Sequence, residues 1–159
     1  RDSSPLKRKL VIPVCYSTAY GLDLEAVCQE KTLEKEALIK LHTETTYKVY
    51  MLGFVAGFAY LGTTAAKLNI SRKEEPRKAI PAGSVGLAGR QTGIYPVEAP
   101  GGWQIIGRTP LNMFDINREQ PNLLAAGDEV VFKSITEDEF KLIALKVETG
   151  IYKIEGTNV

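Results

Sequence analysis

The sequence predicts a mainly β domain, either a closed barrel or a sandwich, with a few short helices. Short runs of β-forming residues recur along the chain, and turns rich in glycine and proline separate them. Half of the 14 glycines lie in one stretch, 81–110. A length of 159 residues suits one domain with a single core and is too short for two domains of ordinary size.

The first part of the chain predicts two helices between two strands. Residues 10–16 form a short apolar run typical of a strand, and residues 45–52 alternate as a strand does. Residues 23–30 and 33–42 have the apolar spacing of helices, and Thr32 is a plausible N-cap for the second. Both helices carry acidic side chains that would repel DNA phosphates, so we interpret them as caps on the β-structure.

The second part of the chain ends in a strand, a helix and a last strand or arm. Residues 129–135 have strand character, and Thr136 with Glu139 fits a capping box that opens a helix running to about Val147. Residues 151–159 form the last segment. Earlier in the chain, the charged run 72–78 is most simply a solvated loop.

Composition excludes several classes of partner. Twenty basic and nineteen acidic side chains nearly cancel without forming long blocks, so we expect neither nucleic acid nor an anionic membrane surface as partner. No apolar run is long enough to span a bilayer and no signal-peptide pattern is present, so we expect a cytoplasmic protein. With one histidine and no suitably spaced cysteine, we expect no metal site.

Two segments combine glycine with aromatic side chains and predict a ligand-binding cleft. The first, 53–62, carries Phe54, Phe58 and Tyr60. The second, 81–110, carries Gln91, Thr92, Tyr95, Trp103 and Arg108. The rings can form walls, Gln91 can read an amide edge, and Arg108 can bind a carboxylate. The alternative is that these segments contain only strand turns over an aromatic plug.

No complete catalytic motif accompanies this predicted cleft. The sequence has no Ser-His-Asp order, no phosphate-binding loop ending in Gly-Lys-Ser/Thr and no dinucleotide fingerprint. His42 lies at the end of the second predicted helix, where it can serve as a capping or core side chain or belong to the site. We therefore assign no catalytic residue.

The glycine-rich stretch resembles a known family. Its members include the B subunit of bacterial 5-oxoprolinase, the carboxyltransferase (allophanate hydrolase subunit 1-like) domain of urea carboxylase, and the sporulation inhibitor KipI. The matching residues are 76–77, 80–85, 87–89, 91–96, 100–103 and 106–110, with 12–16 and 52–62 upstream and Phe114, Asp115, Arg118, Pro121, 123–124 and 127–128 downstream. Ala56 and Ala126 stand where the family commonly has proline.

The resemblance implies a cyclophilin-like closed β-barrel with short capping helices over residues 1–159. Residues 1–9 would then be the remnant of a linker to a separate N-terminal domain. It further implies that the chain works with carboxyltransferase-like companion subunits in an ATP-dependent 5-oxoprolinase, which converts 5-oxoproline to glutamate. ATP would act at the level of the complex, and the chain alone would be inactive. The family pattern also places a histidine at position 42, near the site.

Two other functions stay open. The first is a protein-binding inhibitor of a sporulation sensor histidine kinase, in which the aromatic cleft docks on the kinase. Ala56 and the tail outside the family pattern point toward such a KipI-like member, and this role is compatible with the enzymatic one. The second is a prolyl isomerase, which rests on fold analogy alone.

Overall fold

The computed structural model describes residues 8–52 and 58–158. The strands in this part of the chain are β1 (Arg8–Val14), β2 (Tyr47–Lys48), β3 (Met51–Leu52), β4 (Ala59–Thr63), β5 (Arg77–Ile80), β6 (Ser84–Ala88), β7 (Gln91–Ile94), β8 (Ala99–Gly101), β9 (Gln104–Arg108), β10 (Glu129–Ser134) and β11 (Glu155–Asn158). The helices are α1 (Leu24–Lys31), α2 (Lys35–Thr43) and α3 (Glu137–Glu148), with a short 3₁₀ helix η1 (Ala66–Leu68).

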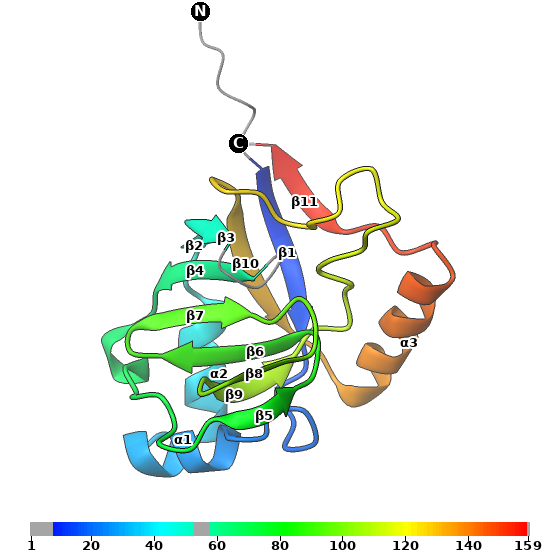
Figure 1. Cartoon of the computed structure of the whole chain (residues 1–159). Coiled ribbons are helices and arrows are strands. Elements are labelled where there is room, and N and C mark those ends of the chain that lie inside the picture. The colour runs from blue at the N-terminus through cyan, green and yellow to red at the C-terminus, as the bar shows by residue number, and fades with distance from the viewer. Residues whose placement is uncertain (1–7, 53–57, 159) are drawn as a thin grey trace, which may run out of the picture.

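These strands form two larger sheets and one separate pair (Figure 1). The four-stranded sheet has the order β11-β1-β10-β2, the five-stranded sheet has the order β3-β4-β7-β6-β9, and β5 pairs with β8. Strands β1 and β10 are parallel, and the other pairs are antiparallel. In Figure 1 the strands of the five-stranded sheet run across those of the other large sheet.

The two larger sheets meet at their corners. On one side the chain passes directly from β2 to β3, and the Tyr50 amide donates to the Tyr60 carbonyl at 2.9 Å. On the other side Cys15 and Arg108 exchange main-chain hydrogen bonds of 2.9 and 3.1 Å. The mainly β prediction is confirmed. Closure into a barrel is not confirmed, because the described strands divide into separate sheets.

The main core lies between the two larger sheets. Alternating residues of β1, including Ile12 and Val14, are fully buried, and Phe132 of β10 lies beside them. Val85 and Leu87 supply the facing layer from β6. Burial of such side chains stabilises the fold by roughly 1.5–3 kcal/mol each, so the period-two pattern fixes which face of each strand points inward.

The helix boundaries follow the sequence pattern, with one exception. Thr32 does not begin the second helix, because its backbone is left-handed, with a φ of 53°, and it caps the end of α1 instead. Glu34 is the residue that precedes α2. The capping box of α3 is confirmed, since Thr136 Oγ1 accepts from the Glu139 amide at 3.1 Å and Glu139 accepts from the Thr136 amide at 2.8 Å.

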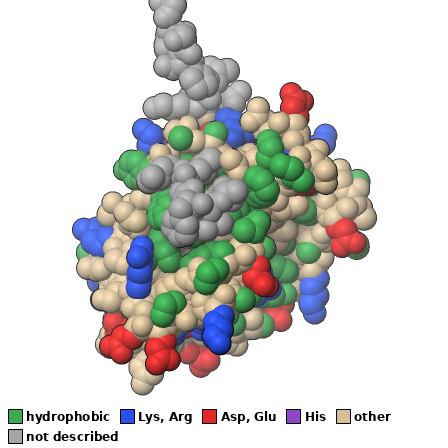
Figure 2. Space-filling view, viewed as in Figure 1, with side chains coloured by type: hydrophobic (Ala, Val, Ile, Leu, Met, Phe, Trp, Pro, Cys, Tyr) green, Lys and Arg blue, Asp and Glu red, His purple; other side chains and the backbone are tan. Residues whose placement is uncertain are grey.

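Figure 2 shows that hydrophobic side chains also gather near the middle of one face, with charged side chains mostly around them. Within residues 8–52 and 58–158, none of the helices is both long and apolar enough to cross a membrane.

Candidate functional site

Four of the predicted site residues form one aromatic cluster. The ring centroid of Phe58 lies 4.7 Å from that of Tyr60, 4.9 Å from that of Tyr95 and 5.4 Å from that of Trp103. The four rings, with Arg72 and residues 100–102, line a cavity of about 120 Å³. We call this cavity the aromatic cleft. Aromatic walls with few polar groups are typical of small-ligand sites.

Glycine makes this arrangement possible at two positions. A Cβ atom at Gly101 would collide with the Tyr95 hydroxyl. A Cβ atom at Gly93 would lie 2.9 Å from the Ala59 carbonyl oxygen, closer than real Cβ atoms approach, and would make a tight contact of 3.0 Å with the Phe58 ring. The glycine-rich segment therefore does more than turn between strands, because it leaves room for two walls of the aromatic cleft.

The cation of the aromatic cleft is Arg72. Its guanidinium carbon lies 5.8 Å from the centroid of the Trp103 ring, within the range of a cation–π contact. Arg72 is exposed, and it forms no ion pair with any residue that the structure describes. Burial raises the pKa of Tyr95 while nearby Arg72 opposes that rise. Tyr95 therefore stays a neutral phenol that can donate a hydrogen bond.

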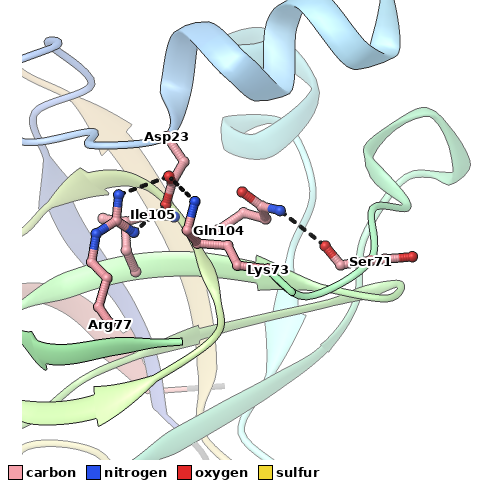
Figure 3. Close-up of polar contacts among 6 residues, drawn as sticks. All are labelled: Asp23, Ser71, Lys73, Arg77, Gln104 and Ile105. Atoms are coloured by element: carbon pink, nitrogen blue, oxygen red, sulfur yellow. Dashed lines mark hydrogen bonds and ion pairs between the residues drawn. The ribbon is translucent and has the colours of Figure 1, made fainter. Parts of the chain in front are cut away.

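A buried carboxylate holds the segment that carries Arg72 (Figure 3). Asp23 precedes α1, and its carboxylate accepts from Arg77 at 2.6 and 2.8 Å and from Lys73 at 3.1 Å. The Ile105 amide donates to the same carboxylate at 2.8 Å. Arg72 is thus one residue away from an anchored lysine, so its backbone position is fixed.

The charge balance around Asp23 favours its ionised form. Burial alone would raise the pKa of this carboxyl, but hydrogen bonds from Arg77, the Ile105 amide and Lys73 outweigh burial and lower the pKa. The expectation that 72–78 is a solvated loop is therefore wrong for Lys73 and Arg77. Sequence reasoning missed Asp23 and Arg72. Only the match of Arg77 to the family pattern hinted at this network.

His42 and Thr92 lie in the core and do not line the aromatic cleft. Thr92 Oγ1 donates to the Gly86 carbonyl at 2.8 Å and lies 3.0 Å from His42 Nε2, while His42 Nδ1 lies 2.6 Å from the Tyr16 hydroxyl. Because the only hydroxyl hydrogen of Thr92 goes to Gly86, Nε2 must donate and Nδ1 must accept. Burial lowers the pKa of His42 to about 3, so the imidazole is neutral.

Arg108 and Gln91 also lie apart from the aromatic cleft. The Arg108 guanidinium carbon lies 5.0 Å from the centroid of the Tyr20 ring, which itself stacks on Phe140 of α3 at 4.2 Å. Burial lowers the pKa of Arg108. Gln91 is exposed at the start of β7. Phe54, like Ala56, lies outside the described residues, and Ala126 is exposed in a turn.

Comparison with known proteins defines the class of this chain. Residues 1–124 match the family described as carboxyltransferase domain, subdomain C and D. The chain therefore belongs to this carboxyltransferase family, as the sequence resemblance predicted.

Particular relatives are named as the B subunit of 5-oxoprolinase. The chain is 49% identical to that of Bacillus subtilis over 84% of this chain and 56% of the relative. It is 50% identical to that of Haemophilus influenzae over 79% of this chain and 59% of the relative. The chain thus spans little more than half the length of these relatives.

Solved structures agree with this family. A conserved uncharacterized protein from Pyrococcus horikoshii is 46% identical, with a TM-score of 0.80 over 83% of this chain and 61% of that protein. The urea amidolyase of Kluyveromyces lactis has a TM-score of 0.81 at 19% identity, over 98% of this chain and 11% of that one. At that identity the second likeness concerns the fold alone.

Proposed function

We propose that this chain is a subunit domain of an ATP-dependent 5-oxoprolinase and that the aromatic cleft holds the 5-oxoproline ring. The observation that carries this proposal is the grouping of four aromatic rings and the exposed Arg72 guanidinium around one small cavity. The relatives that are named as 5-oxoprolinase subunits support the choice of reaction.

The chemistry of the aromatic cleft suits this substrate. A five-membered lactam is flat, so it can stack against Trp103 and Phe58. Its carboxylate matches the guanidinium of Arg72, and its carbonyl can accept from the Tyr95 hydroxyl. The cavity of about 120 Å³ is well below the roughly 300 Å³ at which sites for drug-sized ligands begin, which favours a single small ring.

ATP would be handled by companion subunits. A cavity of about 120 Å³ with one guanidinium does not fit a nucleoside triphosphate, and the sequence has no phosphate-binding loop. We therefore assign this chain the task of binding and orienting the lactam while carboxyltransferase-like partner subunits supply nucleotide chemistry in the cytoplasm.

The test is glutamate formation by the chain reconstituted with companion subunits of a bacterial 5-oxoprolinase. The variant Arg72→Gln should lower kcat/KM by about tenfold or more, since it removes a charge-assisted contact to the substrate. Arg90→Gln is the matched control, because Arg90 is an exposed arginine outside the aromatic cleft. Unchanged kcat/KM in Arg72→Gln would reject the assignment.

A second function, inhibition of a sensor histidine kinase, is favoured by the apolar face in Figure 2. An aromatic cleft can equally receive a proline or an aromatic side chain of a partner protein. Kinase autophosphorylation should then fall in the presence of the chain and recover with Trp103→Ala. Autophosphorylation that is the same with and without the chain excludes this role.

A further inference from the structure

A second cavity, of about 370 Å³, lies between the loop that follows β9 and the end of α3. Its apolar walls are Leu111 and Leu123 from the loop and Val147, Tyr152 and Ile154 from the C-terminal segment. It shares no lining residue with the aromatic cleft. Its volume falls in the range of about 300–1,000 Å³ that is usual for small-molecule sites.

One guanidinium in this cavity lacks a counter-charge. Arg118 donates from Nη2 to the Pro121 carbonyl at 2.8 Å, which fixes the side chain. Its Nε is buried and has no hydrogen-bond partner among the residues that the structure describes. Arg118 forms no ion pair with any described residue. Because Arg118 lines the cavity without a counter-charge from the described residues, the geometry favours an anionic group that a ligand would bring.

An acidic side chain lines the same cavity. Asp115 is held by the Asn117 amide, which donates to Oδ1 at 2.9 Å. Asp115 and Arg118 are not paired with each other. The cavity therefore offers a cation and an anion beside a mainly apolar wall.

We propose that this cavity binds a small carboxylate with an apolar body. The ligand carboxylate accepts hydrogen bonds from Arg118, and its alkyl or aromatic part packs against Val147 and Ile154. An apolar α-amino acid would in addition place its ammonium group near Asp115. The C-terminal wall lies beyond residue 124, where the family match ends. The two cavities share no lining residue, so this site is separate from the proposed lactam site.

The test is an NMR titration of the full chain with L-leucine and with 4-methylpentanoate, following the backbone amides of Gly150 and Ile154. We expect saturable shifts with at least one of the two probes. Stronger binding of leucine would identify amino acids as the ligand class, and equal binding would identify free carboxylic acids. Leucinamide, which lacks the carboxylate, should bind at least about tenfold more weakly.

Substitutions test whether the probes bind in this cavity. Arg118→Gln should weaken it about tenfold or more, whereas Arg90→Gln should not, although Arg90 likewise donates to a main-chain carbonyl. Val147→Phe should fill the cavity and leave Arg118 in place, so we expect it to abolish binding. This variant tests the proposal even if Arg118→Gln does not fold. No saturable shift with either carboxylate, or equal binding of leucinamide, overturns the proposal. Because neither probe is 5-oxoproline, this result is independent of the 5-oxoprolinase assay.

Discussion

Arg77 donates two hydrogen bonds, of 2.6 and 2.8 Å, to the carboxylate of Asp23, which lies 54 residues earlier in the chain. This pair fixes the segment that carries Arg72 against the start of α1. The orientation of the proposed substrate therefore depends on a residue that does not touch the aromatic cleft.

Asp23→Asn should destabilise the chain and loosen Arg72. The variant leaves Arg77 and Lys73 without their carboxylate, and their partial exposure reduces the loss to about 1–3 kcal/mol of unfolding free energy. Urea denaturation at pH 7 measures this loss, with the exposed Glu98→Gln as control. Equal stability of Asp23→Asn and the unsubstituted chain would contradict the anchoring role.

The same carboxylate predicts a pH dependence. The pKa of Asp23 is lower in the fold than its unfolded value of about 3.9. Its contribution to stability is therefore complete above about pH 4 and is lost as the pH falls through the folded pKa. Urea midpoints measured between pH 5 and pH 2.5 should fall less steeply in Asp23→Asn. Parallel curves for the two proteins count against this assignment.

His42 should stay neutral well below its ordinary pKa. The pKa of this buried imidazole is about 3 in the fold, against about 6.5 when unfolded, so its stabilising contribution is complete above pH 6.5 and declines as the pH falls toward 3. It is the only histidine in the chain, so its ¹⁵N signals are unambiguous. They should report hydrogen on Nε2 at pH 5, and a charged ring at that pH would be incompatible with the buried network.

Gly101→Ala should distort the aromatic cleft. Its Cβ atom would collide with the Tyr95 hydroxyl, and overpacking of this kind costs about 1–3 kcal/mol. Gly102→Ala is a closely matched control, because the nearest atom to its Cβ would be 3.5 Å away. Thermal unfolding should give a lower melting temperature for Gly101→Ala than for Gly102→Ala. Equal melting temperatures would show that the aromatic cleft accommodates a methyl group at position 101.

Thr136→Ala should weaken the start of α3. It removes the hydroxyl that accepts from the Glu139 amide, and loss of such a cap costs about 1 kcal/mol. Hydrogen exchange of the α3 amides should become faster. Thr149→Ala at the other end of the helix should have a smaller effect, because Thr149 only donates to carbonyls that already belong to the helix.

Local pattern was enough to predict several elements of the fold, although the run 45–52 forms two short strands, β2 and β3, and not one. The period-two runs predicted β1 and β10 to within two residues, and the Thr136–Glu139 spacing predicted the beginning of α3. Glycine with aromatic residues indicated which rings would gather. These signals lie within a few residues of one another, so a sequence can reveal them directly.

Long-range contacts could not be read from the sequence in the same way. The sequence offered Arg108 as the cation of the cleft, but the structure places it over Tyr20 and places Arg72 over Trp103. Both arrangements depend on how distant segments pack. The burial of His42 has the same origin, because it requires α2 to meet Tyr16, which follows β1, and Thr92 of β7.

Fluorescence of the chain's single tryptophan gives the most direct test of the proposed lactam site, since Trp103 lines the aromatic cleft. Titration with 5-oxoproline should change the emission saturably, and the change should be lost in Arg72→Gln and kept in Arg90→Gln. Emission that does not respond to 5-oxoproline, or that responds equally in Arg72→Gln, would contradict the account of a lactam held between Trp103 and Arg72.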